Sequence, residues 1–137
     1  MKFFVDSANI EQIIRINELG LCDGVTTNPT LVAKEGRSFK ETVKEICRIV
    51  KGPVSAEVVS PDAESMLKEA REIVSWADNV VIKVPMTPEG VRATRLMTRD
   101  RIRINMTLIF SVPQALIAAK AGADFISALA GRLDDLG

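Results

Sequence analysis

One lysine, Lys83, stands in the middle of an apolar run, which is an unusual place for an ammonium group. It lies within residues 79–86, with two Val and an Ile before it and another Val directly after it. If this run is a central strand, the ammonium loses hydration, so the neutral amine is favoured and the pKa of the lysine falls. A neutral amine can attack a carbonyl carbon. The alternative is a lysine whose stem packs while its head reaches solvent or pairs with a carboxylate.

Polar side chains also stand at the carboxyl ends of the other apolar runs. They are Asp6; Thr26 and Asn28; Glu57; Asn105 and Thr107; and Ser127. Glu57 could form an ion pair with Lys83 or hold a water molecule that carries protons. Asp6 could accept a proton from a substrate hydroxyl or cap the following helix. Asn28 and Asn105 suit a polyhydroxylated substrate, or else a turn and a strand end, and Thr107 could be a plain strand former.

A further cation, Arg132, follows the sixth apolar run directly after a glycine. Its planar guanidinium fork suits a phosphate group, and Ser127 could add a hydroxyl from the same loop. The alternative is a surface arginine that pairs with Asp134 or Asp135. A local cationic pocket would be needed for any phosphorylated ligand, because 18 Lys+Arg and 18 Asp+Glu give a formal net charge of zero.

Two periodicities alternate along the chain, and together they predict the elements that position these side chains. The predicted strands are Phe3–Val5, Gly24–Thr27, Val54–Val59, Val80–Val84, Ile102–Leu108 and Phe125–Ser127. The predicted helices include Ile10–Leu19, Phe39–Val50, Ala63–Trp76, Gly90–Thr98 and Pro113–Ala121. Ser7 or Asn9 is expected to cap the first helix, and Ser60 the helix that begins near residue 63.

This alternation is typical of a repeating βα unit with short parallel strands, in which polar side chains converge at the carboxyl ends of the strands. The 137 residues predict a single domain, residues 1–137. Six units are two fewer than a (βα)8 barrel needs, so length alone favours an open doubly wound sheet. The chemistry of the strand ends favours the barrel instead.

The composition excludes several classes of function. The chain has no His and no Tyr, so a histidine base, a histidine metal ligand and a tyrosine acid are all excluded. We expect no metal and no cofactor, because no glycine-rich nucleotide motif follows a strand and the two cysteines are far apart. We expect no nucleic-acid or membrane partner. Two isolated cysteines and the absence of a secretory leader indicate the cytoplasm.

Six segments of the chain closely resemble the small transaldolase family, which includes the fructose-6-phosphate aldolases. The segments are residues 3–9, 23–31, 57–58, 82–86, 105–108 and 131–135. The resemblance implies an α/β fold of the (βα)8 TIM-barrel type and a Schiff-base lysine on strand four, at Lys83. It implies that Asp6 is the acid/base partner and that Glu57 holds the catalytic water.

The same resemblance assigns the other polar residues. Asn28, Asn105 and Thr107 match the residues around the ketose and the water, and Thr26 belongs to the substrate-binding set. Ser127 and Arg132 match the positions that contact phosphate. The implied substrates are sugar phosphates, and the implied assembly is a homo-oligomer.

The chain departs from the family's pattern in ways that bear on activity. It ends where the family continues with two more strands, so we expect exposed strand edges, and association rather than a stable monomer. Residues 127–132 read Ser-Ala-Leu-Ala-Gly-Arg, where the family usually has Ser-Pro-Phe-Val-Gly-Arg. The absence of tyrosine, together with Glu57 in place of glutamine, favours a transaldolase over an aldolase that releases dihydroxyacetone. A third hypothesis is an inactive, sugar-phosphate-binding or structural fragment.

Overall fold

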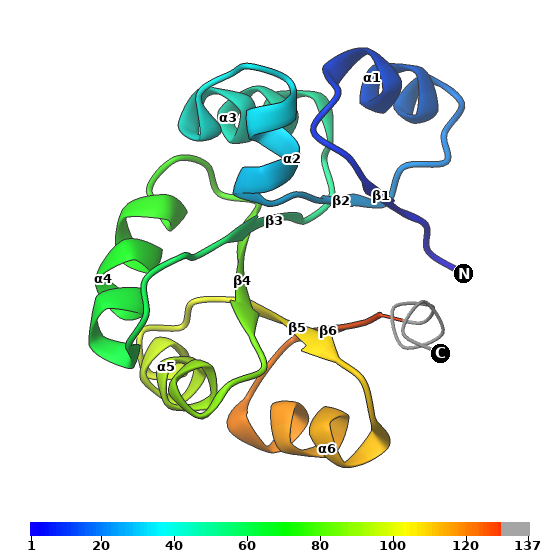
Figure 1. Cartoon of the computed structure of the whole chain (residues 1–137). Coiled ribbons are helices and arrows are strands. Elements are labelled where there is room, and N and C mark those ends of the chain that lie inside the picture. Colours follow the sequence, from blue (N-terminus) through cyan, green and yellow to red (C-terminus); the bar gives the residue numbers. More distant parts are fainter. Residues whose placement is uncertain (130–137) are drawn as a thin grey trace. The chain divides into compact units, whose positions relative to one another are not determined.

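The computed structural model describes residues 1–129, in which strands and helices alternate along the chain (Figure 1). The strands are β1 (Phe4–Asp6), β2 (Gly24–Thr26), β3 (Val54–Glu57), β4 (Val80–Pro85), β5 (Ile104–Ile109) and β6 (Phe125–Ala128). The helices are α1 (Ile10–Glu18), α2 (Pro29–Lys34), α3 (Phe39–Ile49), α4 (Ala63–Val74), α5 (Pro88–Arg99) and α6 (Val112–Ala121).

The hydrogen-bonded order of the strands follows the order of the chain, from β1 to β6. The pairs β1–β2, β2–β3 and β5–β6 are parallel, and at least one helix stands between the two strands of each pair in the sequence. Parallel neighbours joined through helices are the repeating βα unit of a (βα)8 barrel. The predicted α/β class is therefore confirmed, as is the βα repeat, which has six strands within residues 1–129.

The ends of the elements follow local chemistry. All six predicted strands are present, and their ends differ from the prediction by two residues at most. Asn9 caps α1, because its Oδ1 accepts a hydrogen bond of 3.0 Å from the Gln12 amide. The expectation that Ser60 caps α4 is wrong. Helix α4 begins only at Ala63, and the Asp62 side chain caps it by accepting from the amide of Ser65 at 3.0 Å.

The chain divides into two compact units, and the first comprises Met1–Glu57 together with Arg71–Ile82. Within it, α1, α2 and α3 lie on one side of β1 and β2 (Figure 1). The core of this unit includes Val25 and Val54 of the strands, which pack with Ile13 of α1 and Ile46 of α3. Burial of these branched side chains is the main favourable contribution to the stability of this layer.

The second unit comprises Val58–Ala70 and the chain from Lys83 onward. Its helices α5 and α6 lie on one side of β5 and β6 (Figure 1). The core on that side includes Met106, Ile109 and Ala118, of which the first two belong to β5 and the third to α6. Each unit is thus a parallel sheet with a helical layer on one face. The prediction that residues 1–137 form one domain stays a prediction.

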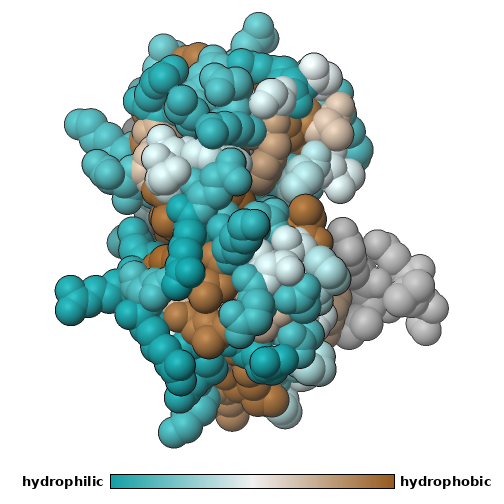
Figure 2. All heavy atoms as spheres, turned by 90° about the vertical axis from the view of Figure 1, so that its left-hand side faces the viewer, coloured by the Kyte–Doolittle hydropathy of each residue, from teal (hydrophilic) through white to brown (hydrophobic). Residues whose placement is uncertain are grey.

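The surface carries mostly polar side chains. Hydrophilic residues cover most of the face seen in Figure 2, and hydrophobic residues gather in patches between them. Several large apolar side chains are exposed, including Phe3 near β1, Leu116 on α6 and Ile126 on β6. Within residues 1–129, no helix has the length and apolar character needed to cross a bilayer.

Candidate active site

In the first unit, the predicted site residues that lie on strands share the face of the sheet that is turned away from the helices. Val25 and Val54 face the helical layer, and side chains alternate between the two faces along a strand. Thr26 and Ser55 therefore point to the opposite face, where they are partners in the register of β2 and β3. Glu57 stands two residues after Ser55 and shares this face, where it is half-buried.

Asp6 and Thr26 form a direct contact on that face. They are register partners at the ends of β1 and β2, and the Thr26 hydroxyl donates to Asp6 Oδ1 at 2.7 Å. Asp6 does not cap α1, because Asn9 does, so one of the two alternatives for Asp6 is overturned. Asp6 is exposed, and its carboxylate accepts from a neutral donor.

Asn28 has a structural role that the sequence left open. It is the N-cap of α2, and its Oδ1 accepts a hydrogen bond of 2.9 Å from the Leu31 amide. The side-chain oxygen is therefore engaged in capping α2, which is a structural role other than the turn offered as the alternative. A ligand would meet the Nδ2 group, which can only donate.

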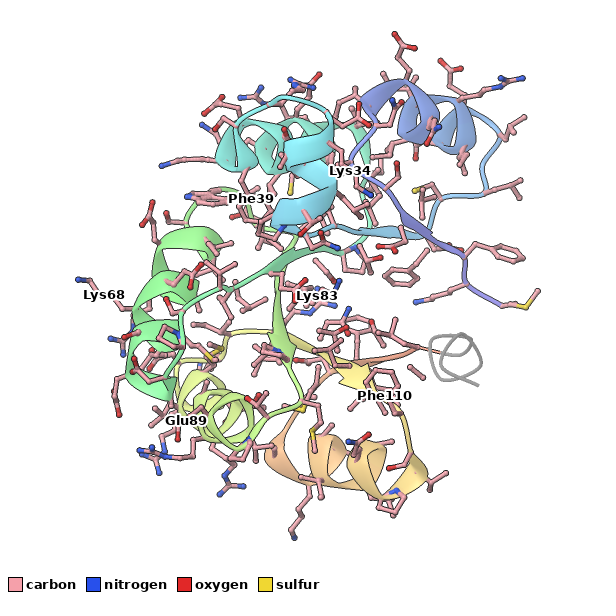
Figure 3. All side chains as sticks on the ribbon, in the orientation of Figure 1. Lys34, Phe39, Lys68, Lys83, Glu89 and Phe110 are labelled. Atoms are coloured by element: carbon pink, nitrogen blue, oxygen red, sulfur yellow. The ribbon has the colours of Figure 1, made fainter. Side chains whose placement is uncertain are left out.

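Lys83 lies in the second unit on β4, and its residue is only 7% exposed. Figure 3 shows it on the side of the strand away from α5. The three residues before it and the one after it are also buried, as expected for a strand covered on both faces. Its backbone carbonyl accepts from the Val58 amide at 3.1 Å, so its peptide is part of the sheet. A lysine buried to this degree is rare unless it is paired or has a function.

The other site residues of this unit lie on β5 and β6. Asn105 and Thr107 are both buried, and the Ser127 hydroxyl donates to Asn105 Oδ1 at 2.9 Å. Because Met106 packs against α6, the two residues beside it in β5 face away from the helices. The contact between Asn105 and Ser127 orients an amide and a hydroxyl that can both bind oxygen-rich ligands.

The strand that carries Asn105 and Thr107 is distorted directly after Thr107. Leu108 has a φ of 60°, in the left-handed region, and the register between β5 and β6 shifts between Met106 and Ile109. This is a β-bulge, which changes the direction in which side chains point and is common beside active sites. Sequence reasoning missed it, because leucine carries no signal for a left-handed conformation.

Sequence reasoning also missed Ser55, which is buried beside Thr26. The signal was present, since Ser55 stands two residues before Glu57 and so on the same face of a strand. Arg132, the predicted phosphate ligand, lies outside the residues that the structure describes. Its predicted role stays a prediction.

The acidic side chains and the two cysteines are the groups that could hold a metal or act as a thiol nucleophile. In the described part of the chain, no three His, Cys, Asp or Glu side chains form a cluster that could hold a metal ion. Cys22 and Cys47 are free and half-buried, and both pack against the core of the first unit. Burial raises the pKa of Cys47 to about 11, so this thiol stays protonated and unreactive at neutral pH.

Comparison with known proteins identifies relatives along the whole chain. The family model described as transaldolase/fructose-6-phosphate aldolase matches residues 3–137. A probable transaldolase of Methanococcus vannielii is 62% identical over 137 residues, which are 100% of this chain and 64% of that protein. Probable transaldolase 2 of Listeria monocytogenes is 60% identical over 100% of this chain and 63% of its own length. The chain therefore spans a little under two thirds of these relatives.

Solved structures support the fold alone. A putative phosphonomutase from Burkholderia cenocepacia superposes with a TM-score of 0.66 at 13% identity, over 91% of this chain and 67% of that one. A mandelate oxidase with benzoyl-formic acid superposes with a TM-score of 0.60 at 13% identity, over 91% of this chain and 48% of that one. At this level of identity the likeness concerns the arrangement of strands and helices.

Proposed function

Because the chain belongs to the transaldolase/fructose-6-phosphate aldolase family, we propose that it transfers a dihydroxyacetone unit from a ketose phosphate to an aldose phosphate. Sedoheptulose 7-phosphate and fructose 6-phosphate are the proposed donors. The observation that carries the proposal is Lys83, a lysine residue only 7% exposed on a strand of the parallel sheet. Such an amine can form a Schiff base with a ketose.

The proposed chemistry begins with attack of the Lys83 Nζ on the ketose carbonyl carbon. The carbinolamine loses water, and the resulting iminium withdraws electrons so that the neighbouring carbon–carbon bond can break. The hydroxyl of the departing aldose must lose its proton at this step, and we assign that proton to Asp6. The Thr26 hydroxyl, which donates to Asp6 at 2.7 Å, holds the accepting carboxylate in place. The enamine then adds to the acceptor aldehyde, and water releases the product.

Glu57 is proposed to hold the water that exchanges protons during formation and hydrolysis of the Schiff base. Asn105 and Thr107 are proposed to complete this set of polar groups. Both are buried, and the bond from Ser127 fixes the Asn105 carboxamide. Binding of the sugar phosphate is assigned to Asn28, Thr26, Ser127 and Arg132.

A trapping experiment tests the proposal. The chain is incubated with fructose 6-phosphate and borohydride, and the peptides are mapped by mass spectrometry. We expect a reduced three-carbon adduct at Lys83 and none in a Lys83→Met variant. The exposed lysine Lys68 serves as the matched control, because a Lys68→Met variant should still be labelled. Adduct on another lysine, or none in the wild-type chain, would contradict the assignment.

The role of Glu57 is tested with Glu57→Gln. If Glu57 holds a proton-carrying water, this variant should still form the Lys83 adduct, while turnover falls by about 10²- to 10⁴-fold. A simple charge-pair role predicts instead that the adduct is lost or that the chain misfolds. Full activity in the variant would refute both roles.

Product analysis separates the proposed transferase from the alternative in the same family. A transaldolase makes a new ketose phosphate only when an acceptor aldose phosphate is present. A fructose-6-phosphate aldolase releases free dihydroxyacetone without any acceptor. The alternative is retained because the matching family includes both activities.

Two further properties are proposed with this function. We expect the chain to form a homo-oligomer, because large apolar side chains such as Phe3, Leu116 and Ile126 are exposed. Light scattering at micromolar concentration tests this, and a monodisperse monomer would contradict it. We also expect a cytoplasmic location, supported by two free cysteines.

A further inference from the structure

Beyond the buried Val58, the loop of residues 58–62, between β3 and α4, has little apolar contact to hold it. Val59 is 71% exposed, and Pro61 and Asp62 are also exposed. Its backbone is instead bound by a carboxylate from α4. Glu69 Oε1 and Oε2 both accept from the Val59 amide at 3.1 Å, and Oε2 accepts from the Ser60 amide at 2.9 Å. One side chain therefore satisfies two consecutive amides of the loop.

A second carboxylate, from α5, holds the far end of this loop. Glu89 Oε2 accepts from the amide of Ala63, the first residue of α4, at 2.9 Å. Arg92 Nη1 donates to Glu89 Oε1 at 3.0 Å and so fixes the carboxylate. The hydrogen bond from Ala63 is the largest cause that lowers the pKa of Glu89, which is therefore ionised at neutral pH. A negative charge at the start of both helices is favoured by their dipoles.

The loop is connected directly to the peptide of Lys83. The amide of Val58, with which the loop begins, donates to the Lys83 carbonyl at 3.1 Å. Val58 itself is buried, whereas the residue after it is exposed. Any movement of the loop therefore acts first on the hydrogen bond between the Val58 amide and the Lys83 carbonyl.

We propose that Glu69 and Glu89 are positioning residues for Lys83. They hold the loop of residues 58–62 in one conformation, and thereby keep the hydrogen bond from the Val58 amide to the Lys83 carbonyl intact. This role rests on the proposed function, because Lys83 is the nucleophile there. Neither carboxylate contacts the substrate in this scheme. They act on the position and direction of the Lys83 amine. A misplacement of a reacting group by about 1 Å can lower the reaction rate by about 100-fold.

Hydrogen exchange and trapping test the proposal together. The variants are Glu69→Ala, Glu69→Gln and, as the matched control, Glu64→Ala, which removes a carboxylate from the exposed face of the same helix. In Glu69→Ala, we expect exchange at the Val59 amide to accelerate by about tenfold or more, because its bonds to a charged acceptor are lost. Exchange at the Val58 amide should also accelerate, because the loop then no longer holds its bond to the Lys83 carbonyl. The rate of Lys83 trapping by saturating fructose 6-phosphate should fall by about tenfold to 100-fold.

The two other variants separate positioning from general stability. Glu69→Gln keeps one acceptor oxygen, so we expect it to recover part of both effects, and it serves if the alanine variant fails to fold. Glu64→Ala should leave the exchange of the loop amides and the trapping rate within twofold of the wild type.

Each outcome decides a different point. Unchanged exchange at Val58 in both Glu69 variants overturns the inference, whatever the sugar chemistry. Faster exchange with an unchanged trapping rate also overturns it, because the loop then does not position Lys83. If the wild-type chain forms no adduct, the proposed function fails, and the exchange at Val58 alone decides whether the carboxylates hold the loop.

Discussion

A buried hydroxyl without a partner, at Thr27, gives the sharpest test of the packing. Thr27 follows β2, is 0% exposed, and its amide donates to the Ser55 carbonyl at 3.1 Å. Its Oγ1 has no hydrogen-bond partner among the described residues. Valine has nearly the same shape as threonine but has a methyl group in place of the hydroxyl. We therefore predict that Thr27→Val stabilises the fold.

The expected gain follows from two contributions. A buried polar group without a partner costs about 1–3 kcal/mol relative to its hydrated state. The new methyl group adds a further favourable transfer term of about 0.8 kcal/mol. Because the neighbours of Thr27 relax in part and the unfolded chain is itself compact, we expect a net gain of about 1–2 kcal/mol in the free energy of unfolding. For a chain of this length that raises the Tm by about 3–6 °C.

Urea and thermal unfolding of paired variants make the measurement. The matched control is Thr42→Val in the same unit, where the threonine is also 0% exposed but its hydroxyl donates to the Ser38 carbonyl at 2.8 Å. That variant should lose about 0.5–1.5 kcal/mol, the net value of a made hydrogen bond. A loss of stability in Thr27→Val similar to that in Thr42→Val would refute the reasoning, because it would mean that the Thr27 hydroxyl has a partner.

Three further predictions concern other parts of the chain. Iodoacetamide at pH 8 should alkylate Cys47 about 100-fold more slowly than an ordinary thiol, since burial raises its pKa from 9.0 to about 11; reaction at the ordinary rate would contradict this. Gly52→Ala should destabilise the chain by about 3 kcal/mol in urea unfolding, because the added Cβ would lie 1.8 Å from the Asp23 carbonyl oxygen; an unchanged midpoint would show that the backbone can yield. Glu89→Gln should lower the Tm at pH 7. The difference in Tm from wild type should shrink as the pH falls below 4.5, the ordinary pKa of a Glu carboxyl. A lowered pKa in the folded state gives stability that is present above this ordinary pKa and is lost as the carboxylate is protonated. A difference that persists at pH 2 would exclude a role for the charge.

Much of the fold could be predicted from the sequence, because period-two and period-3.6 patterns directly reflect which faces are buried. Helix α2 had no predicted range, since its six residues are too few to show a helical period. The start of α4 at Ala63 was predicted correctly, but the residue that caps it was not. Ser60 and Asp62 are both suitable caps by residue type, and only the contact of Ser60 with Glu69 decides between them.

The candidate site, too, could be predicted from the sequence only in part. The sequence placed Asp6 and Thr26 at strand ends, but their hydrogen bond depends on the register of β1 with β2, which local patterns do not specify. The buried state of Lys83 was predictable from its apolar neighbours, and the structure confirms it. The hydrogen bonds of Glu69 to the loop of residues 58–62 were not predictable. In the sequence Glu69 resembles any glutamate on an exposed helix face, and only its distance to the loop amides distinguishes it.

The extra residue that Leu108 adds to β5 bears on how the length of this strand can change. Three steps along β5, from Met106 to Ile109, match only two steps along β6. Losing a residue from a strand ordinarily turns every later side chain to the other face. Deletion of Leu108 would instead restore regular alternation and leave Met106 and Ile109 both facing Ala118 of α6, as they do now. A one-residue deletion between Met106 and Ile109 is thus tolerable for the pairing of β5 with β6, so the bulge marks where a buried strand can change in length.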